Sequence, residues 1–128
     1  MRQFIEVLVK KYKDDILAYK LLHQRMATVA CSTGSEDCLF LYLLVRYLKP
    51  TNILEIGTFV GSTLFAIITA CEENKQPYII HTIDNHDELK LENKLLHSVK
   101  VHKGWSREVL KNINTKFDFV FSDANRSE

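Results

Sequence analysis

The stretch NILEIGTFVGSTLFAI, residues 52–67, decides the fold. It opens with branched apolar residues that predict a buried strand, is interrupted by Gly57 and Gly61, and resumes with helical spacing from Ser62. Glycine tolerates positive φ and lets a ligand approach the backbone, and the start of a helix presents N–H groups that lack intrahelical acceptors. The stretch therefore predicts a sharp turn from strand to helix, with a ligand site over the turn.

Strand-like and helix-like segments alternate around this turn. The expected helices cover residues 3–26, 35–48, 62–73, 87–97 and 106–114, and the expected strands cover 52–56, the end of 76–84, 99–102 and 117–121. Pro50 stops the second helix just before the strand at 52–56. Alternation of this kind predicts parallel βαβ units with right-handed crossovers, and so an α/β fold.

The polar residues and glycines of this pattern fall at the expected carboxyl ends of strands. Glu55 and Gly57 end the first strand, Asp84 the second and Asp123 the fourth, while Gly104 follows the third. Ligands of open parallel sheets bind beyond these strand ends. Asp84 follows the glycine turn by about 20 residues, a spacing that suits a carboxylate accepting hydrogen bonds from the two hydroxyls of a ribose. The pattern thus predicts a ligand that contains a nucleoside.

The glycine spacing separates two cofactor types. A dinucleotide fold carries G-x-G-x-x-G, whereas Thr58 and Phe59 follow Gly57 here. The pattern here is an acid, one further residue, a glycine, three residues and a second glycine. This pattern resembles motif I of the class I S-adenosylmethionine (SAM)-dependent methyltransferases. The segments TID, GWSREVL and FDFVFSDANRSE resemble later motifs of the O-methyltransferase branch related to catechol and caffeoyl-coenzyme A O-methyltransferases. The resemblance spans about residues 30–128.

The resemblance implies a fold and a division of the chain. The fold is a Rossmann-like three-layer sandwich with a mainly parallel sheet of about four strands in the order 3-2-1-4, without the last three strands of the family. Residues 1–128 would form a single, incomplete SAM-methyltransferase-like domain, truncated at its C-terminus. An amphipathic helix would occupy residues 1–28, and a Rossmann-like core residues 29–128.

The implied function is transfer of a methyl group from SAM to a hydroxyl of a small acceptor. Two alternatives stay open: a truncated remnant that binds SAM without turning it over, and an interaction module in which the N-terminal helix pairs with a partner. The residues that match the cofactor site of the family are Glu55, Gly57, Thr58, Gly61, Ser62, Asp84, Gly104, Trp105 and Ser106. The first five form the turn beside the methionine portion, Asp84 meets the ribose, and the last three lie against the adenine.

The resemblance implies a magnesium site only in part. Asp123 matches the first carboxylate that binds the divalent cation, which in such enzymes holds both oxygens of a catechol-like acceptor. Arg126 stands where family members carry lysine, and Asn125 replaces a second acid. Arginine cannot act as a base, and one carboxylate is a poor cage for Mg²⁺. Little activity is therefore expected from these 128 residues alone.

Each of these residues also has a simpler interpretation. Gly57 and Gly61 could merely permit a tight turn, Asp84 could cap the following helix, Trp105 could be packing, and Asp123 could be a solvated strand end. The five histidines show no metal-ligand spacing and are expected in surface or core positions.

Composition and charge restrict the partners and the compartment. The chain is 46% hydrophobic and 26% charged with a net charge of +1, so no excess positive field attracts nucleic acid or an anionic membrane. The longest apolar run, residues 39–45, is far shorter than the roughly 20 residues of a membrane span. A cytoplasmic location follows by default. Cys31, Cys38 and Cys71 are expected as buried thiols.

The strand at residues 117–121 raises the question of a partner. In the order 3-2-1-4 this strand lies at an edge of the sheet, and Phe117, Phe119 and Phe121 are expected on one face with Val120 on the other. No lysine or proline blunts this edge. A homo-oligomer, or a partner that covers the edge, is therefore expected.

Overall fold

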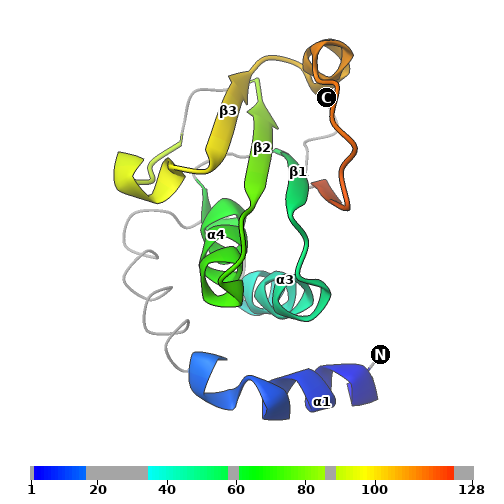
Figure 1. Cartoon of the computed structure of the whole chain (residues 1–128), viewed down its shortest axis with the longest axis vertical. Helices are drawn as coiled ribbons and strands as arrows, with labels where there is room; N and C mark the ends of the chain where they lie inside the picture. The colour runs from blue at the N-terminus through cyan, green and yellow to red at the C-terminus, as the bar shows by residue number, and fades with distance from the viewer. Residues whose placement is uncertain (1, 17–34, 58–60, 86–88, 123–128) are drawn as a thin grey trace.

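The computed structural model describes residues 2–16, 35–57, 61–85 and 89–122 (Figure 1). Its helices are α1 (Arg2–Lys11), α3 (Ser35–Leu48), α4 (Ser62–Asn74) and α5 (Ser106–Val109), with short 3₁₀ turns η1 (Asn93–Leu96) and η2 (Leu110–Asn112). Its strands are β1 (Asn52–Ile56), β2 (Ile79–Asp84), β3 (Val99–Lys103) and β4 (Phe119–Ser122).

The four strands form one sheet in the order β3-β2-β1-β4, and all three pairings are parallel. The arrows of β1, β2 and β3 accordingly point the same way in Figure 1. The predicted α/β class, strand order and parallel pairing are confirmed. Since all strands run in one direction, the carboxyl ends of β1 to β4 meet at a single edge, where the predicted site residues fall.

The core lies between the sheet and helices α3 and α4. Ile53 of β1 and Ile80 of β2 are fully buried on this face, and the same apolar cluster contains Leu64 and Ile67 of α4. Helix α4 is buried on nearly all sides, which explains why its first ten residues carry no charged side chain. Burial of each such large side chain contributes about 1.5 to 3 kcal/mol, so this layer holds the start of α4 firmly against β1.

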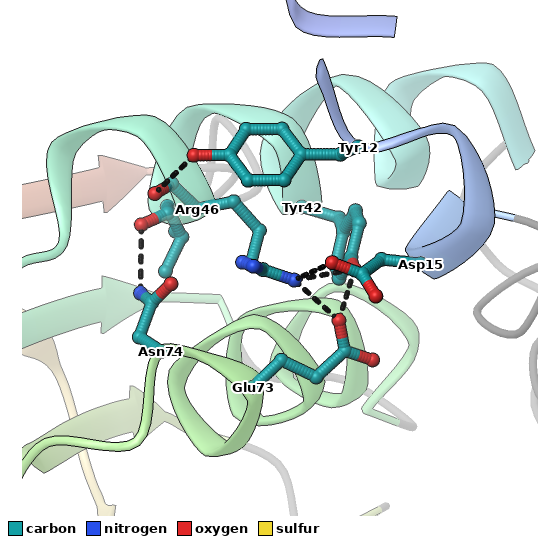
Figure 2. Close-up of polar contacts among 7 residues, drawn as sticks. Tyr12, Asp15, Tyr42, Arg46, Glu73 and Asn74 are labelled. Carbon is teal, nitrogen blue, oxygen red and sulfur yellow. Dashed lines mark hydrogen bonds and ion pairs between the residues drawn. The ribbon is translucent and has the colours of Figure 1, made fainter. Parts of the chain in front are cut away.

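A polar cluster fastens the N-terminal segment to this layer (Figure 2). The Arg46 guanidinium, on α3, donates to Asp15 at 2.7 Å and to Glu73 of α4 at 2.6 Å, and it stacks 4.5 Å from the ring centre of Tyr12. Tyr42 also donates to Glu73. Burial and the bond to Glu73 raise the pKa of Tyr42 above its ordinary value, so the hydroxyl keeps its proton. Three segments are thus joined through one guanidinium.

Two predicted helices are wrong in length or kind. Of the helix predicted at 87–97 the structure describes residues 89–97, and of these 89–92 are not helical while Asn93–Leu96 form η1. The physical reason is tertiary: Leu91 is buried and packs with Leu89 against the turn at Gly61. The helix predicted at 106–114 is a single turn, α5, followed by η2, and the chain is extended at Ile113.

The edge strand is also shorter than predicted. Strand β4 begins at Phe119. The chain bends at Asp118, whose carboxylate accepts hydrogen bonds from the backbone N–H groups of Thr51 and Asn52 at 3.0 and 2.9 Å. Phe119 and Phe121 pack against the core as expected. Phe117 does not share their environment, because its ring lies edge-on to His81.

The N-terminal half of the predicted first helix is confirmed. Helix α1 ends at Lys11, and a bond from the Ile16 N–H to the Tyr12 carbonyl adds a further helical turn. Residues 17–34 lie outside the described part, so the boundary between residues 28 and 29 stays a prediction. Cys38 and Cys71 are buried as expected, and Cys31 lies outside the described residues. Within the described ranges no helix is long and apolar enough to cross a membrane.

Candidate functional site

Three strand ends meet at the expected edge of the sheet. The Gly57 N–H, just after β1, donates to the Ile83 carbonyl of β2 at 2.8 Å, and the Gly104 N–H, just after β3, donates to the Asp84 carbonyl at 2.9 Å. Both glycines have positive φ, +97° and +147°, a region that other residues rarely adopt. Gly57, Asp84 and Gly104 are therefore neighbours along one edge, as the sequence predicts.

Glu55 lies beneath this edge with its carboxylate engaged in the interior. The residue is fully buried, Oε1 accepts the Thr82 hydroxyl of β2 at 2.6 Å, and Oε2 accepts the Thr63 hydroxyl of α4 at 2.5 Å. The carboxylate thus joins β1, β2 and the first turn of α4. Neither threonine was predicted as a site residue, although Thr82 lies directly opposite Glu55 in the parallel register.

Gly61 forms the junction between the turn and α4. It precedes the first helical residue with φ +108°, and its carbonyl accepts the Phe65 N–H at 2.8 Å. A Cβ placed on Gly61 would lie 2.9 Å from atoms of both Leu89 and Leu91. The glycine therefore allows the segment that follows β2 to pack onto the start of α4, where Ser62 is buried.

The remaining predicted cofactor residues that the structure describes lie at the end of β2 and just after β3. Asp84, the last residue of β2, is half-buried, and Trp105 is 38% exposed directly before α5. The Trp105 carbonyl accepts the N–H groups of Glu108 and Val109, which fixes the backbone from which the indole projects. Ser106 is half-buried at the start of α5. An acid and a partly exposed aromatic ring therefore lie on adjacent strand ends.

Two predicted site residues are not placed by the structure. Thr58, in the glycine turn, and Asp123, after β4, lie outside the described residues. Among the residues that are described, no group of three or more His, Cys, Asp or Glu side chains could hold a metal ion. The magnesium site at Asp123 thus stays a prediction.

Comparison with protein families gives a match over the same segments. A family model described as "Methyltransferase domain" matches residues 54–128. The match begins in β1, just before Glu55, and includes every predicted site residue. A search of curated proteins finds no match.

Solved structures show the same fold. A methyltransferase of Podospora anserina, PaMTH1, solved with S-adenosylhomocysteine (SAH), superposes with a TM-score of 0.61 at 20% identity over 98% of this chain and 58% of its own. The O-methyltransferase TomG of Streptomyces achromogenes, in complex with SAM, superposes with a TM-score of 0.58 at 24% identity. The match covers 94% of this chain and 60% of TomG. A putative caffeoyl-CoA O-methyltransferase of Staphylococcus aureus superposes with a TM-score of 0.57 at 21% identity. The match covers 87% of this chain and 58% of that protein.

The chain therefore spans about three fifths of the length of these structures while nearly all of it superposes on them. At these identities the superpositions show the fold, and the family match carries the membership. Because that match covers more than half of the 128 residues and contains the strand ends described above, the chain belongs to the methyltransferase domain family.

Proposed function

We propose that the chain binds SAM, or its demethylated product SAH, over the turn between β1 and α4. In this proposal it provides the cofactor site of an O-methyltransferase that acts on a hydroxyl of a small acceptor. The observation that carries the proposal is the arrangement of Gly57, Asp84 and Gly104 on three neighbouring strand ends, held by two interstrand hydrogen bonds. The bound SAM and SAH of the similar structures support the same cofactor.

The residues present fit such a cofactor. The Asp84 carboxylate is half-buried at a strand end, and it can accept hydrogen bonds from both hydroxyls of a ribose. Trp105 offers a partly exposed ring for the adenine, since flat aromatic surfaces stack favourably. The first turn of α4 directs backbone N–H groups toward the turn, where a carboxylate of the methionine portion would lie.

Glu55 has a different part in this proposal. Its carboxylate already accepts two buried hydroxyls, so its main contribution is to hold the turn. By joining Thr63 of α4 to Thr82 of β2, it keeps the glycine turn and the strand end of Asp84 in a fixed relation. Positioning of this kind matters because small displacements of a bound reactant lower the rate of transfer strongly.

The chemistry would come from the cofactor, and the chain would bind and orient it. SAM supplies a methyl group on a positively charged sulfur, which is ready for attack by an oxygen nucleophile. Asp123 would be one carboxylate ligand of a magnesium ion beside the acceptor. The acceptor itself is proposed only as a small hydroxyl compound, on the basis of the O-methyltransferase fold.

Two assays test this proposal. Titration of the folded chain with SAM, SAH and NAD should give heat with the first two and none with NAD, because the turn lacks the pyrophosphate glycine. Methyl transfer from SAM to catechol with Mg²⁺, and its loss with chelator or in Asp123→Asn, would then identify an active enzyme. Binding without transfer would identify a cofactor-binding module instead. A folded chain that binds neither SAM nor SAH contradicts the proposal.

A further inference from the structure

Two histidines from neighbouring strands form a stacked pair on the face of the sheet that is opposite to α4. His81 of β2 follows Ile80 and precedes Thr82, both of which face α4, so its side chain points to the other side. The imidazoles of His81 and His102 of β3 are nearly parallel, at 8°, with ring centres 5.2 Å apart. Nδ1 of His81 and Nε2 of His102 are 2.9 Å apart, a hydrogen bond.

This hydrogen bond depends on protonation. One of the two facing nitrogens must carry the proton and the other must accept it, so the pair exists with both rings neutral or with one charged. When both rings are protonated, two N–H groups and two positive charges face each other across 2.9 Å. Within the described residues no other hydrogen bond of either ring is found.

The surroundings of the pair disfavour positive charge. His81 is only 7% exposed, with the apolar Leu54 of β1 beside it in the register and the ring of Phe117 edge-on at 5.5 Å. The charged group that acts on both imidazoles is Lys100 of β3, which is itself a cation. Burial first, and these positive neighbours second, lower the pKa of His81 and of His102 below the ordinary value of 6.5.

We propose that the His81–His102 pair is a pH-sensitive clasp between β2 and β3, closed while the rings share one proton and opened by acid. The ring of Phe117, two residues before β4, packs edge-on against His81 and so lies beside the pair. As both groups bind protons more weakly in the closed form than in an opened or unfolded chain, closure is complete above about pH 6.5 and weakens as the pH falls below it.

The clasp lies close to the candidate cofactor site. His81 precedes Asp84 on β2, and His102 precedes Gly104 at the end of β3, and the Gly104 N–H donates to the Asp84 carbonyl. Opening of the pair would therefore loosen the pairing that holds Asp84 beside Gly104. A second consequence, which rests on the proposed function, is that affinity for SAH falls over the same pH interval.

Titration of the unmodified chain by nuclear magnetic resonance tests the clasp directly, without cofactor. The imidazole signals of His81 and His102 should titrate below 6.5, the ordinary value for histidine, because burial and the cationic Lys100 lower the pKa of both rings. Amide exchange at residues 100–103, corrected for intrinsic rates, should accelerate roughly tenfold or more between about pH 7.5 and 5.5. Titration of both rings at or above the ordinary value of 6.5, or unchanged protection of β3, overturns the proposal.

Variants separate the clasp from general acid sensitivity. His81→Phe combined with His102→Phe keeps two flat rings but removes the shared proton, so the pH dependence of exchange at β3 should disappear. His97→Gln, the matched control, should retain it. A double variant that folds and keeps the full dependence overturns the proposal, and if it does not fold the titration of the unmodified chain decides. Absence of SAH binding at every pH would count against the proposed function alone.

Discussion

Glu55 and Thr82 lie opposite each other in two parallel strands, and the Thr82 hydroxyl donates to the fully buried Glu55 carboxylate at 2.6 Å. The second oxygen of the same carboxylate accepts the Thr63 hydroxyl. A buried carboxylate is stable only when its oxygens are hydrogen-bonded, and these two threonines contribute part of that compensation. The acid of the glycine motif is thus part of the framework that supports the site.

Replacement of Glu55 should therefore destabilise the fold as well as the site. Glu55→Ala leaves the hydroxyls of Thr63 and Thr82 without their acceptor and opens a cavity, at a cost of about 3 kcal/mol in the free energy of unfolding. Glu55→Gln keeps the shape and one acceptor oxygen and should cost less. Urea denaturation measures both. The control Glu108→Ala, at a side chain 61% exposed, should change stability by less than about 0.5 kcal/mol. Equal stability of Glu55→Ala and the unmodified chain would refute this role.

Arg46 should be the residue that holds the N-terminal segment (Figure 2). Arg46→Met keeps the apolar stem but leaves the carboxylates of Asp15 and Glu73 without their cation. We expect the free energy of unfolding to fall by about 2 kcal/mol. This is less than for a fully buried pair, because the side chains of Asp15 and Glu73 are 43% and 27% exposed. Proteolysis should then cut α1 away sooner.

The matched control for Arg46 is Lys94→Met. Lys94 pairs with Glu92 at 3.3 Å, but both side chains are more than two thirds exposed, at 78% and 72%. Lys94→Met should lower the free energy of unfolding by less than about 0.5 kcal/mol. If the two variants unfold at the same denaturant concentration, the cluster does not anchor the segment.

Asp118 should make stability depend on acid. Burial opposes ionisation of this carboxyl, but the bonds from the backbone N–H groups of Thr51 and Asn52 outweigh it and lower its pKa below 3.8. A lowered pKa in the folded state gives stability that is present above pH 3.8 and is lost as the pH falls through the folded pKa. Asp118→Ala should thus cost about 0.5 kcal/mol at pH 7, since solvent screens the exposed carboxylate, and the cost should shrink as the pH falls below 3.8. The exposed Asp14→Ala serves as control, and a penalty for Asp118→Ala that is constant with pH would disprove the linkage.

The edge of β4 should promote self-association. Among the described strands β4 pairs only with β1, its Val120 is 56% exposed, and Phe119 and Phe121 are only partly buried. A lysine on an edge strand discourages pairing with another chain. Val120→Lys should therefore lower the apparent mass in light scattering across a concentration series. Val7→Lys on α1, at a residue 64% exposed, makes the same chemical change elsewhere and should not. A concentration-independent monomer before any substitution would exclude the association.

The sequence predicted the sheet well because its strands carry strong local signals. The apolar runs at 52–56 and 79–83 are rich in branched residues, Gly57 and Asp84 mark their ends, and Gly104 follows the third strand. Once a parallel order was assumed, these strand ends had to meet at one edge. The placement of the described cofactor candidates at that edge follows from the same reasoning.

The features that the sequence did not predict depend on contacts between distant segments. Residues 87–97 have helical spacing, yet Leu89 and Leu91 pack against Gly61. Likewise, nothing local shows that Thr63 and Thr82 converge on Glu55. The strand register sets the contact of Thr82 with Glu55, and a shift by one residue would turn every side chain to the other face. The contacts of Thr63, Leu89 and Leu91 depend instead on how α4 and the segment after β2 pack together.

We expect Asp84, the last residue of β2, to bind the ribose of SAM or SAH. Calorimetric titration of the folded chain with SAH, compared with Asp84→Ala and with Asp14→Ala as a control, tests it most directly. The unmodified chain and Asp14→Ala should both bind SAH saturably. In Asp84→Ala the affinity should fall roughly tenfold or more, because charge-assisted hydrogen bonds worth about 1.5 to 3 kcal/mol are lost. No binding by the folded chain, or equal affinity in Asp84→Ala, would show that Asp84 does not bind the ribose.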